Sequence, residues 1–305
     1  MRLPLAALTV AIALPVQAET PGKTRAETQA KTLGWGRIFS NDYIGDGHDR
    51  WRSGSFALSM IRGDAWDGAP PAGPDALLEL RFRSEILAPA RTRDGRDDRP
   101  YAGLLAFGAF GHQSLGPIEG SFGGEVIARG PSTGLSEFQE RTHDILGFEP
   151  PRGTDRQLGD ALHLHAQSEV AWPLRPDDRL TLRPFLAAEA GSEELLRLGA
   201  DLVWGGIGHD ALWLRDPVTG QPYRGIEAPE TGWAVTAGAD WAAVGDSVFL
   251  PGREERDRTR ARAGLHWQPA PEIRLFYGLT WLSEEFAGQH EAQVLGSLKL
   301  EFGLW

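Results

Sequence analysis

One segment near the middle of the chain carries residue types that could do acid–base chemistry. In IARGPSTGLSEFQERTHDILGFEPPRG, residues 127–153, Gln139 and His143 are four positions apart and Glu149 follows. On a helix, residues four apart lie on one face. A histidine beside an amide and a carboxylate suits general-base catalysis. The alternative is an ordinary surface histidine that does no chemistry.

A second segment, SNDYIGDGHDRWRSGS at residues 40–55, is crowded with oxygen ligands. Asn41, Asp42, Asp46 and Asp49 fall within nine residues, and oxygen donors suit a hard cation such as calcium. The spacing is not that of an EF-hand, and a solvated acidic hairpin turn is the alternative. By strand alternation we expect Ser53 to point into a barrel lumen.

Two further motifs have competing interpretations. In DDRPYAGLL, residues 97–105, Arg99 either belongs to ordinary turn chemistry or binds a phosphate through its planar guanidinium. GPSTG matches the G-x-S-x-G pattern of serine hydrolases. That pattern requires a strand-to-helix turn on a parallel α/β sheet, which this chain does not predict. We therefore expect Ser132 to be a helix N-cap.

The elements that must position these residues are strands and one short helix. The helix is expected over about 132–146, closed by Gly147. Elsewhere the chain alternates apolar and polar residues in segments of about ten. Twelve such segments start near residues 32, 51, 76, 101, 118, 158, 179, 194, 231, 257, 272 and 293.

This pattern predicts an all-β fold, a transmembrane antiparallel β-barrel of about 12 strands with the helix at the active site. The even number of strands, the predicted export signal and a final strand ending at Trp305 favour a membrane barrel over a soluble sandwich. Several of the eleven tryptophans lie near expected strand ends, as in interfacial girdles. Both signs of charge are expected to face the lumen, at Glu79, Arg81, Arg83, Glu85, Glu169, Arg183 and Glu189.

The ends and the composition of the chain predict its cellular compartment and its partners. Residues 1–18 read as a secretory signal peptide, residues 19–31 as a flexible mature N-terminus, and residues 32–305 as a single outer-membrane barrel domain. There are no cysteines, so disulfides and thiol chemistry are excluded. A formal net charge of −11 makes nucleic acid a poor partner and divalent cations reasonable ones.

Taken together, SNDYIGDGHDRWRSG, DDRPYAG and GPSTGLSEFQERTHDILGFEPPRG resemble the lipid A 3′-O-deacylase family of Gram-negative outer membranes. The order and spacing of the three motifs agree with that family, whose barrel has twelve strands. The resemblance implies a monomer in the outer membrane that acts on lipid A of lipopolysaccharide, among outer-membrane lipids. It also implies calcium as cofactor and hydrolysis of the 3′-acyloxyacyl ester by water.

The resemblance also implies roles for individual residues. His143 would be the base, while Asp42 and Ser53 would contribute to the metal site and Asn41 to the oxyanion or metal shell. Gln139 would position substrate or water, Glu149 would orient the histidine, and Arg99 would bind a lipid A phosphate. The chain departs from the family at Ser40, where an acid is expected, and at 51–52, where the family is richer in tyrosine.

Two other classes of function stay open. One is a serine-type outer-membrane phospholipase in which Ser132 or Ser53 is the nucleophile and His143 the base. The other is a non-enzymatic barrel, whose lumen either conducts ions or is plugged by salt bridges.

Overall fold

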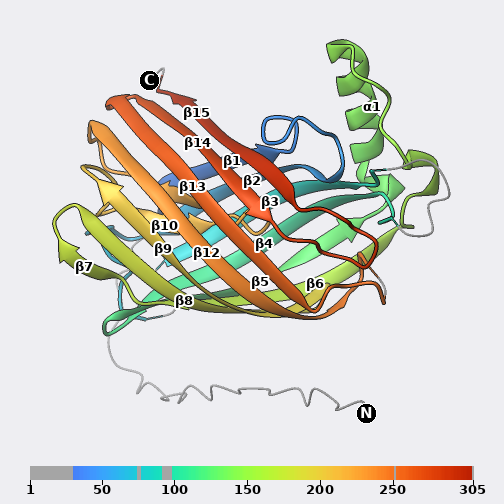
Figure 1. Cartoon of the computed structure of the whole chain (residues 1–305). Helices are drawn as coiled ribbons and strands as arrows, with labels where there is room; N and C mark the ends of the chain where they lie inside the picture. The colour runs from blue at the N-terminus through green and yellow to red at the C-terminus, as the bar shows by residue number, and fades with distance from the viewer. Residues whose placement is uncertain (1–29, 74–76, 91–97, 251, 304–305) are drawn as a thin grey trace.

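Twelve antiparallel strands form a closed barrel in the computed structural model, which describes residues 30–73, 77–90, 98–250 and 252–303 (Figure 1). The strands are β1 (Lys31–Asn41), β2 (Trp51–Gly63), β3 (Leu77–Ala88), β4 (Ala102–Leu115), β5 (Ile118–Arg129), β6 (Ala161–Ala171), β8 (Leu180–Ala190), β9 (Glu193–Gly205), β12 (Gly232–Ser247), β13 (Asp257–Ala270), β14 (Ile273–Leu282) and β15 (Gln293–Phe302). Pairing of β1 with β15 and of β6 with β8 closes the sheet. The prediction of twelve strands is confirmed.

Period-2 alternation explains why these segments form barrel strands. In β3, Glu79, Arg81, Arg83 and Glu85 are buried towards the lumen, while Leu78 and Leu80 are exposed on the outer wall. Such a strand is stable only where the outside is apolar and the inside is polar.

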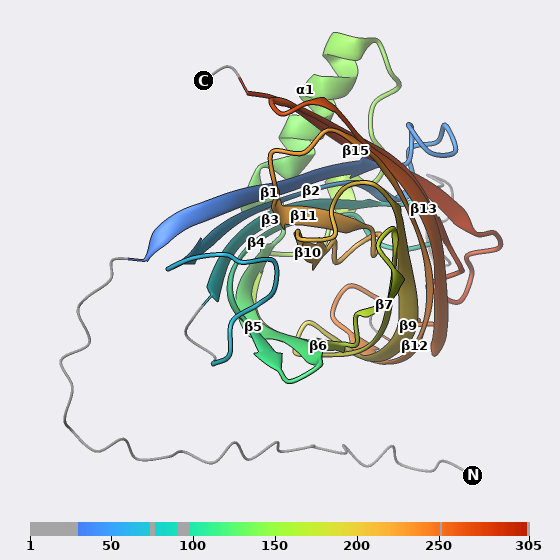
Figure 2. The ribbon, with the colours of Figure 1, turned by 90° about the vertical axis from the view of Figure 1, so that its left-hand side faces the viewer.

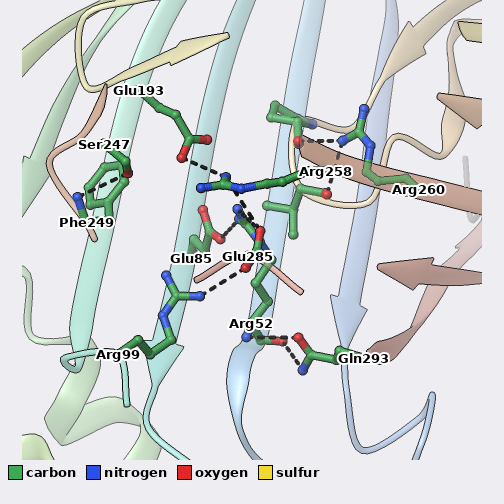
Figure 3. A network of polar contacts seen from close by, with 12 residues as sticks. Arg52, Glu85, Arg99, Glu193, Ser247, Phe249, Arg258, Arg260, Glu285 and Gln293 are labelled. Atoms are coloured by element: carbon green, nitrogen blue, oxygen red, sulfur yellow. Dashed lines mark hydrogen bonds and ion pairs between the residues drawn. The ribbon is translucent and has the colours of Figure 1, made fainter. Parts of the chain in front are cut away.

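Most of the predicted inward charges are paired with one another or with other charged residues inside the lumen. Arg81 binds Glu79, Arg83 binds Glu125, Arg183 binds Glu119 and Glu169 binds Arg215. Near the end of the barrel that carries the helix, Arg52, Glu85, Arg99, Arg258, Glu193 and Glu285 form one connected network (Figure 3). Salt bridges therefore fill much of the lumen.

A small hairpin fills another part of the lumen. β10 (Leu212–Arg215) pairs with β11 (Pro222–Ile226) inside the ring of barrel strands, as the view down the barrel shows (Figure 2). Leu214 and Tyr223 pack there against inward-facing Ile38, Ala57 and Ile61. The sequence did not predict this hairpin, because its strands are too short to show alternation. The short strand β7 (Leu174–Asp177), which pairs with β8, was also not predicted.

The helix lies where it was expected, with a different start. The α-helix α1 spans Leu135–Leu146 and follows a 3-10 turn, η1, at Pro131–Thr133. Gly134, in the left-handed region with φ 70°, is its N-cap. The predicted N-cap role of Ser132 is therefore wrong, and its backbone N–H is instead bound by Asp160. Gly147 ends the helix as predicted.

The loop after α1 contains a second 3-10 turn, η2 (Thr154–Arg156), before β6 begins. Among the described residues, no helix is long and apolar enough to cross a membrane. The predicted signal peptide, nearly all of the predicted flexible N-terminus and the terminal Trp305 lie outside the described residues.

Candidate active site

A β-bulge at the start of β2 decides where Ser53 points. Arg52 pairs with Leu87 and Gly54 with Ile86, so Ser53 is an extra residue without a partner on β3. The bulge breaks the alternation: Arg52 enters the lumen, where it binds Glu85, and the Ser53 side chain turns to the loop 42–50 and α1. The expectation that Ser53 faces the lumen is therefore wrong, because alternation does not hold through a bulge.

Backbone strain accompanies this bulge. Trp51 has φ 52°, the only positive φ at a non-glycine residue among those described. Its buried ring packs against Phe286, with the Arg50 guanidinium 4.3 Å from the ring centroid. A backbone of this kind costs about 1–3 kcal/mol and persists where its surroundings hold it. Strained backbone next to Ser53 is typical of a functional site.

Gln139 connects the helix to the strand ends. Its side-chain amide donates to Ser53 Oγ and to Asp49 Oδ1, both at 3.1 Å, and its oxygen accepts from the Tyr101 hydroxyl at 3.0 Å. Ser53 Oγ also donates to Asp49. These contacts fix the amide orientation and hold α1 against three other segments of the chain.

His143 lies one turn further along α1, buried on the same face as Gln139. Its Nδ1 lies 2.5 Å from the backbone oxygen of Glu149. A carbonyl oxygen can only accept, so Nδ1 donates to it, and Nε2 is the ring nitrogen left to exchange a proton. Nε2 faces Asp49 Oδ2 at 3.6 Å. The arrangement is that of an oriented general base.

The end of β1 brings in an amide and a buried acid. Asn41 donates through Nδ2 to the backbone oxygen of Ser53 at 2.7 Å. Asp42 is fully buried, and its Oδ2 accepts from the Arg50 N–H at 2.6 Å. Burial raises the pKa of Asp42 to about 9, and the nearby carboxylates of Asp49 and Asp46 add to that shift.

One oxygen of the Asp42 carboxylate bears on whether the site can bind a metal. Asp42 Oδ1 is buried without a hydrogen-bond partner, so this carboxylate is short of positive charge. With Ser53 and Asn41 nearby, the available donors are oxygens, as calcium prefers. The described residues contain no group of three or more acidic or histidine side chains able to hold a metal alone. The donors fit a hard cation that also takes backbone or water oxygens.

The structure brings together five of the seven predicted site residues: Asn41, Asp42, Ser53, Gln139 and His143. Glu149 takes part through its backbone oxygen, because its carboxylate is exposed and lies near Arg152. Arg99 is elsewhere, buried in the lumen with Nη1 3.2 Å from Glu285. Its predicted phosphate role stays a prediction.

Tyr101 is a site residue that the sequence did not indicate, and Asp49 was expected only as one of several oxygen ligands for a cation, not as a neighbour of His143. Asp49 contacts Ser53, Gln139 and His143, and Tyr101 orients Gln139. Both belong to motifs that were recognised, SNDYIGDGHDRWRSGS and DDRPYAGLL. Their position within those motifs was the available signal, but only the fold shows which motif members meet.

Comparison with known proteins places the chain among outer-membrane proteins. A family model described as "Outer membrane protein LpxR" matches residues 3–304. A search of curated proteins found no match.

Among solved structures, LpxR from Salmonella typhimurium superposes with a TM-score of 0.74 at 17% sequence identity, covering 88% of this chain and 99% of that one. The β-domain of the Bordetella autotransporter BrkA gives a TM-score of 0.43 at 11% identity, covering 90% and 100%, and supports no argument. The Salmonella match supports the barrel architecture. The family match over nearly the whole chain confirms the resemblance found in the three motifs. The chain therefore belongs to the outer membrane protein LpxR family.

Proposed function

We propose that this protein is a calcium-dependent lipid A 3′-O-deacylase of the outer membrane. Family membership and the barrel support an outer-membrane lipid A deacylase. The observation that carries the chemical proposal is the orientation of His143. Its Nδ1–H is held by the Glu149 backbone oxygen, and its basic Nε2 faces the Asp49 carboxylate.

The reaction is ester hydrolysis at the 3′-position. His143 Nε2 takes a proton from water, whose oxygen forms a bond to the ester carbonyl carbon. The bond from that carbon to the sugar oxygen then breaks, and the imidazolium returns its proton to the sugar oxygen. The products are an acyloxyacyl carboxylic acid and lipid A with a free 3′-hydroxyl.

Other residues orient the base and carry charge. Asp49 lies on the Nε2 side, where its negative charge stabilises the imidazolium, and Gln139 fixes Asp49 and Ser53. Asp42, with Ser53 and Asn41 beside it, would hold calcium. When bound, calcium supplies positive charge for the developing oxyanion.

The alternatives have less support. The hydrogen bonds of Ser53 Oγ within the described part of the chain go to Asp49 and Gln139 rather than to His143, and Ser132 is exposed, so neither serine is paired with the base. A conducting pore is disfavoured by the paired lumen charges and by lumen cavities of only about 60 and 80 Å³.

The test is to express the full chain in a Gram-negative host and measure lipid A by mass spectrometry. Wild type should remove one acyloxyacyl unit, and His143→Ala should slow this by about 10²–10⁴-fold, the usual contribution of a general base. His290→Ala, which removes an exposed histidine between β14 and β15, is the matched control and should retain full activity.

Heat-dependent migration of the barrel on gels confirms that each variant is folded. Deacylation that survives in folded His143→Ala would overturn the mechanism. A covalent serine probe that labels the wild type would favour the phospholipase. No lipid A change with calcium supplied, together with ion conductance, would favour the pore.

A further inference from the structure

The helix α1 has three distinct faces. Ser136, Gln139 and His143 form the buried face. Glu137, Glu140, Arg141 and Asp144 form an exposed charged face. The third face is apolar, and its large side chains are exposed: Phe138 is 62%, Ile145 82% and Leu146 59% accessible. At 100° per residue, the centre of this apolar face lies about 130° around the helix from the centre of the charged one.

Polar groups on the apolar face are satisfied internally. On the helix surface Thr142 lies between Phe138 and Leu146, and its hydroxyl donates to the backbone oxygen of Phe138 at 2.8 Å. The hydroxyl therefore does not need water. A surface of this kind is unusual on a segment exposed to water, where isolated apolar residues are normal and contiguous ones mark an interaction.

The position of α1 shows what could cover this face. In both views the helix projects outward from the barrel wall beyond the strand ends instead of capping the opening (Figures 1 and 2). Its base rests on the outer surface of β4, where Leu135 and Thr133 lie so close to Gly103 that a side chain there would collide. The helix is thus continuous with the outer wall.

We propose that α1 is an interfacial helix whose apolar face lies in the hydrocarbon of the outer leaflet. The outer wall below it is apolar, with Phe107, Leu162 and Leu164 between 66% and 77% exposed. A barrel of an outer-membrane family carries lipid against that wall. An amphipathic helix that leaves the wall sideways, with its charges on a separate face, is suited to lie in the membrane surface.

This arrangement places the buried face of α1, and so His143, at the level where acyl chains meet headgroups. Just past the helix, the Phe148 ring lies edge-on to the His143 ring, with the ring centroids 5.8 Å apart, and its centroid lies 4.8 Å from that of the Tyr43 ring. These rings extend the apolar surface to the site. The membrane contact does not depend on the proposed reaction, and its test uses no turnover.

The absence of cysteine allows the test to be made with single-cysteine probes on the full chain. Ile145→Cys and Glu140→Cys, on the apolar and the charged face of α1, are labelled with an environment-sensitive fluorophore. Leu164→Cys, on the exposed outer wall of β6, is the lipid-facing reference. Each protein is folded into phosphatidylcholine vesicles, with or without nitroxide-bearing acyl chains, and quenching by nitroxide and by aqueous iodide is compared.

At Ile145 we expect a blue-shifted emission, nitroxide quenching close to that at Leu164 and several-fold weaker iodide quenching than at Glu140. Equal iodide access at Ile145 and Glu140, with Leu164 still quenched by nitroxide, would overturn the proposal. Shielding of Ile145 that disappears as protein is diluted in lipid would also overturn it, and would assign the face to a second copy of this chain. A His143→Ala background should give the same pattern, which separates this inference from the proposed reaction.

Discussion

The lumen and the site at the helix differ in how their buried charges are compensated. In the lumen, Arg262 lies between Asp201 and Asp240, and Asp240 also binds Arg197 and Arg260. At the site, Asp42 keeps one oxygen without a partner. One region satisfies its buried carboxylates within the chain, and the other leaves a carboxylate for something else to satisfy.

This difference separates the residues that stabilise the barrel from those that could take part in a reaction. Paired charges in a polar lumen stabilise one arrangement and have little free capacity to bind. A buried acid without a countercharge costs stability and is retained where it binds a cation or substrate. Changes in the lumen should therefore alter stability, and changes at the site should alter activity.

The largest expected effect on stability comes from breaking the lumen network. Arg262→Met removes the guanidinium from two buried aspartates and should lower the free energy of unfolding by about 3–5 kcal/mol. Urea titration in detergent measures the free energy of unfolding, and Arg62→Met, at an exposed arginine, is the control. The activity of the protein that remains folded should be unchanged. If Arg262→Met were as stable as wild type, the lumen charges would not be the scaffold described here.

A smaller effect, on activity alone, is expected at Asp49. Asp49→Asn keeps the size of the side chain but loses the charge that faces His143 Nε2 and the acceptor for Ser53 and Gln139, so deacylation should fall by about 10²-fold. Asp49→Glu should recover part of the rate, because it restores a carboxylate. A purely structural role would instead lower the urea midpoint of Asp49→Asn, with no rescue of the rate by Asp49→Glu.

A third expected effect is a pH dependence of stability caused by Asp42. Its pKa is raised from 3.8 to about 9 by burial, so the folded state binds a proton that the unfolded state has released between these values. Stability should therefore fall as pH rises from about 4 to 9 in EDTA. Calcium at pH 8 should raise the melting temperature, because a bound cation compensates the carboxylate.

In Asp42→Asn, both the pH slope between 4 and 9 and the calcium response should be reduced. The comparison is made by melting each variant in EDTA and in calcium at several pH values. A calcium shift of equal size in Asp42→Asn would place the cation elsewhere in the protein.

Most of the barrel was predictable, because alternation over about ten residues is a strong local signal. The strand starts near 51, 118, 257 and 293 agree with the structure, and the helix was found from its terminal glycine and its break in alternation. The five site residues that meet were predicted because they lie in motifs of mixed amide, acid and hydroxyl types that resemble those of the family.

What the sequence missed depends on contacts between distant segments or on breaks in a regular pattern. The β10–β11 hairpin has too few residues per strand to show a period, and it is held by packing against β1 and β2. The burial of Arg99 against Glu285 joins residues 186 positions apart. The direction of Ser53 followed the period-2 rule, which fails at the bulge where the site is built.

That bulge has a consequence for how such a protein evolves. Ser53 faces α1 because β2 holds one residue more than its partner strand requires. Deleting one residue there would restore regular alternation and separate the hydroxyl from Gln139, while the pairing along the rest of β2 stayed intact. For the proposed reaction, the deletion of a single codon would thus remove a site residue without a change of fold.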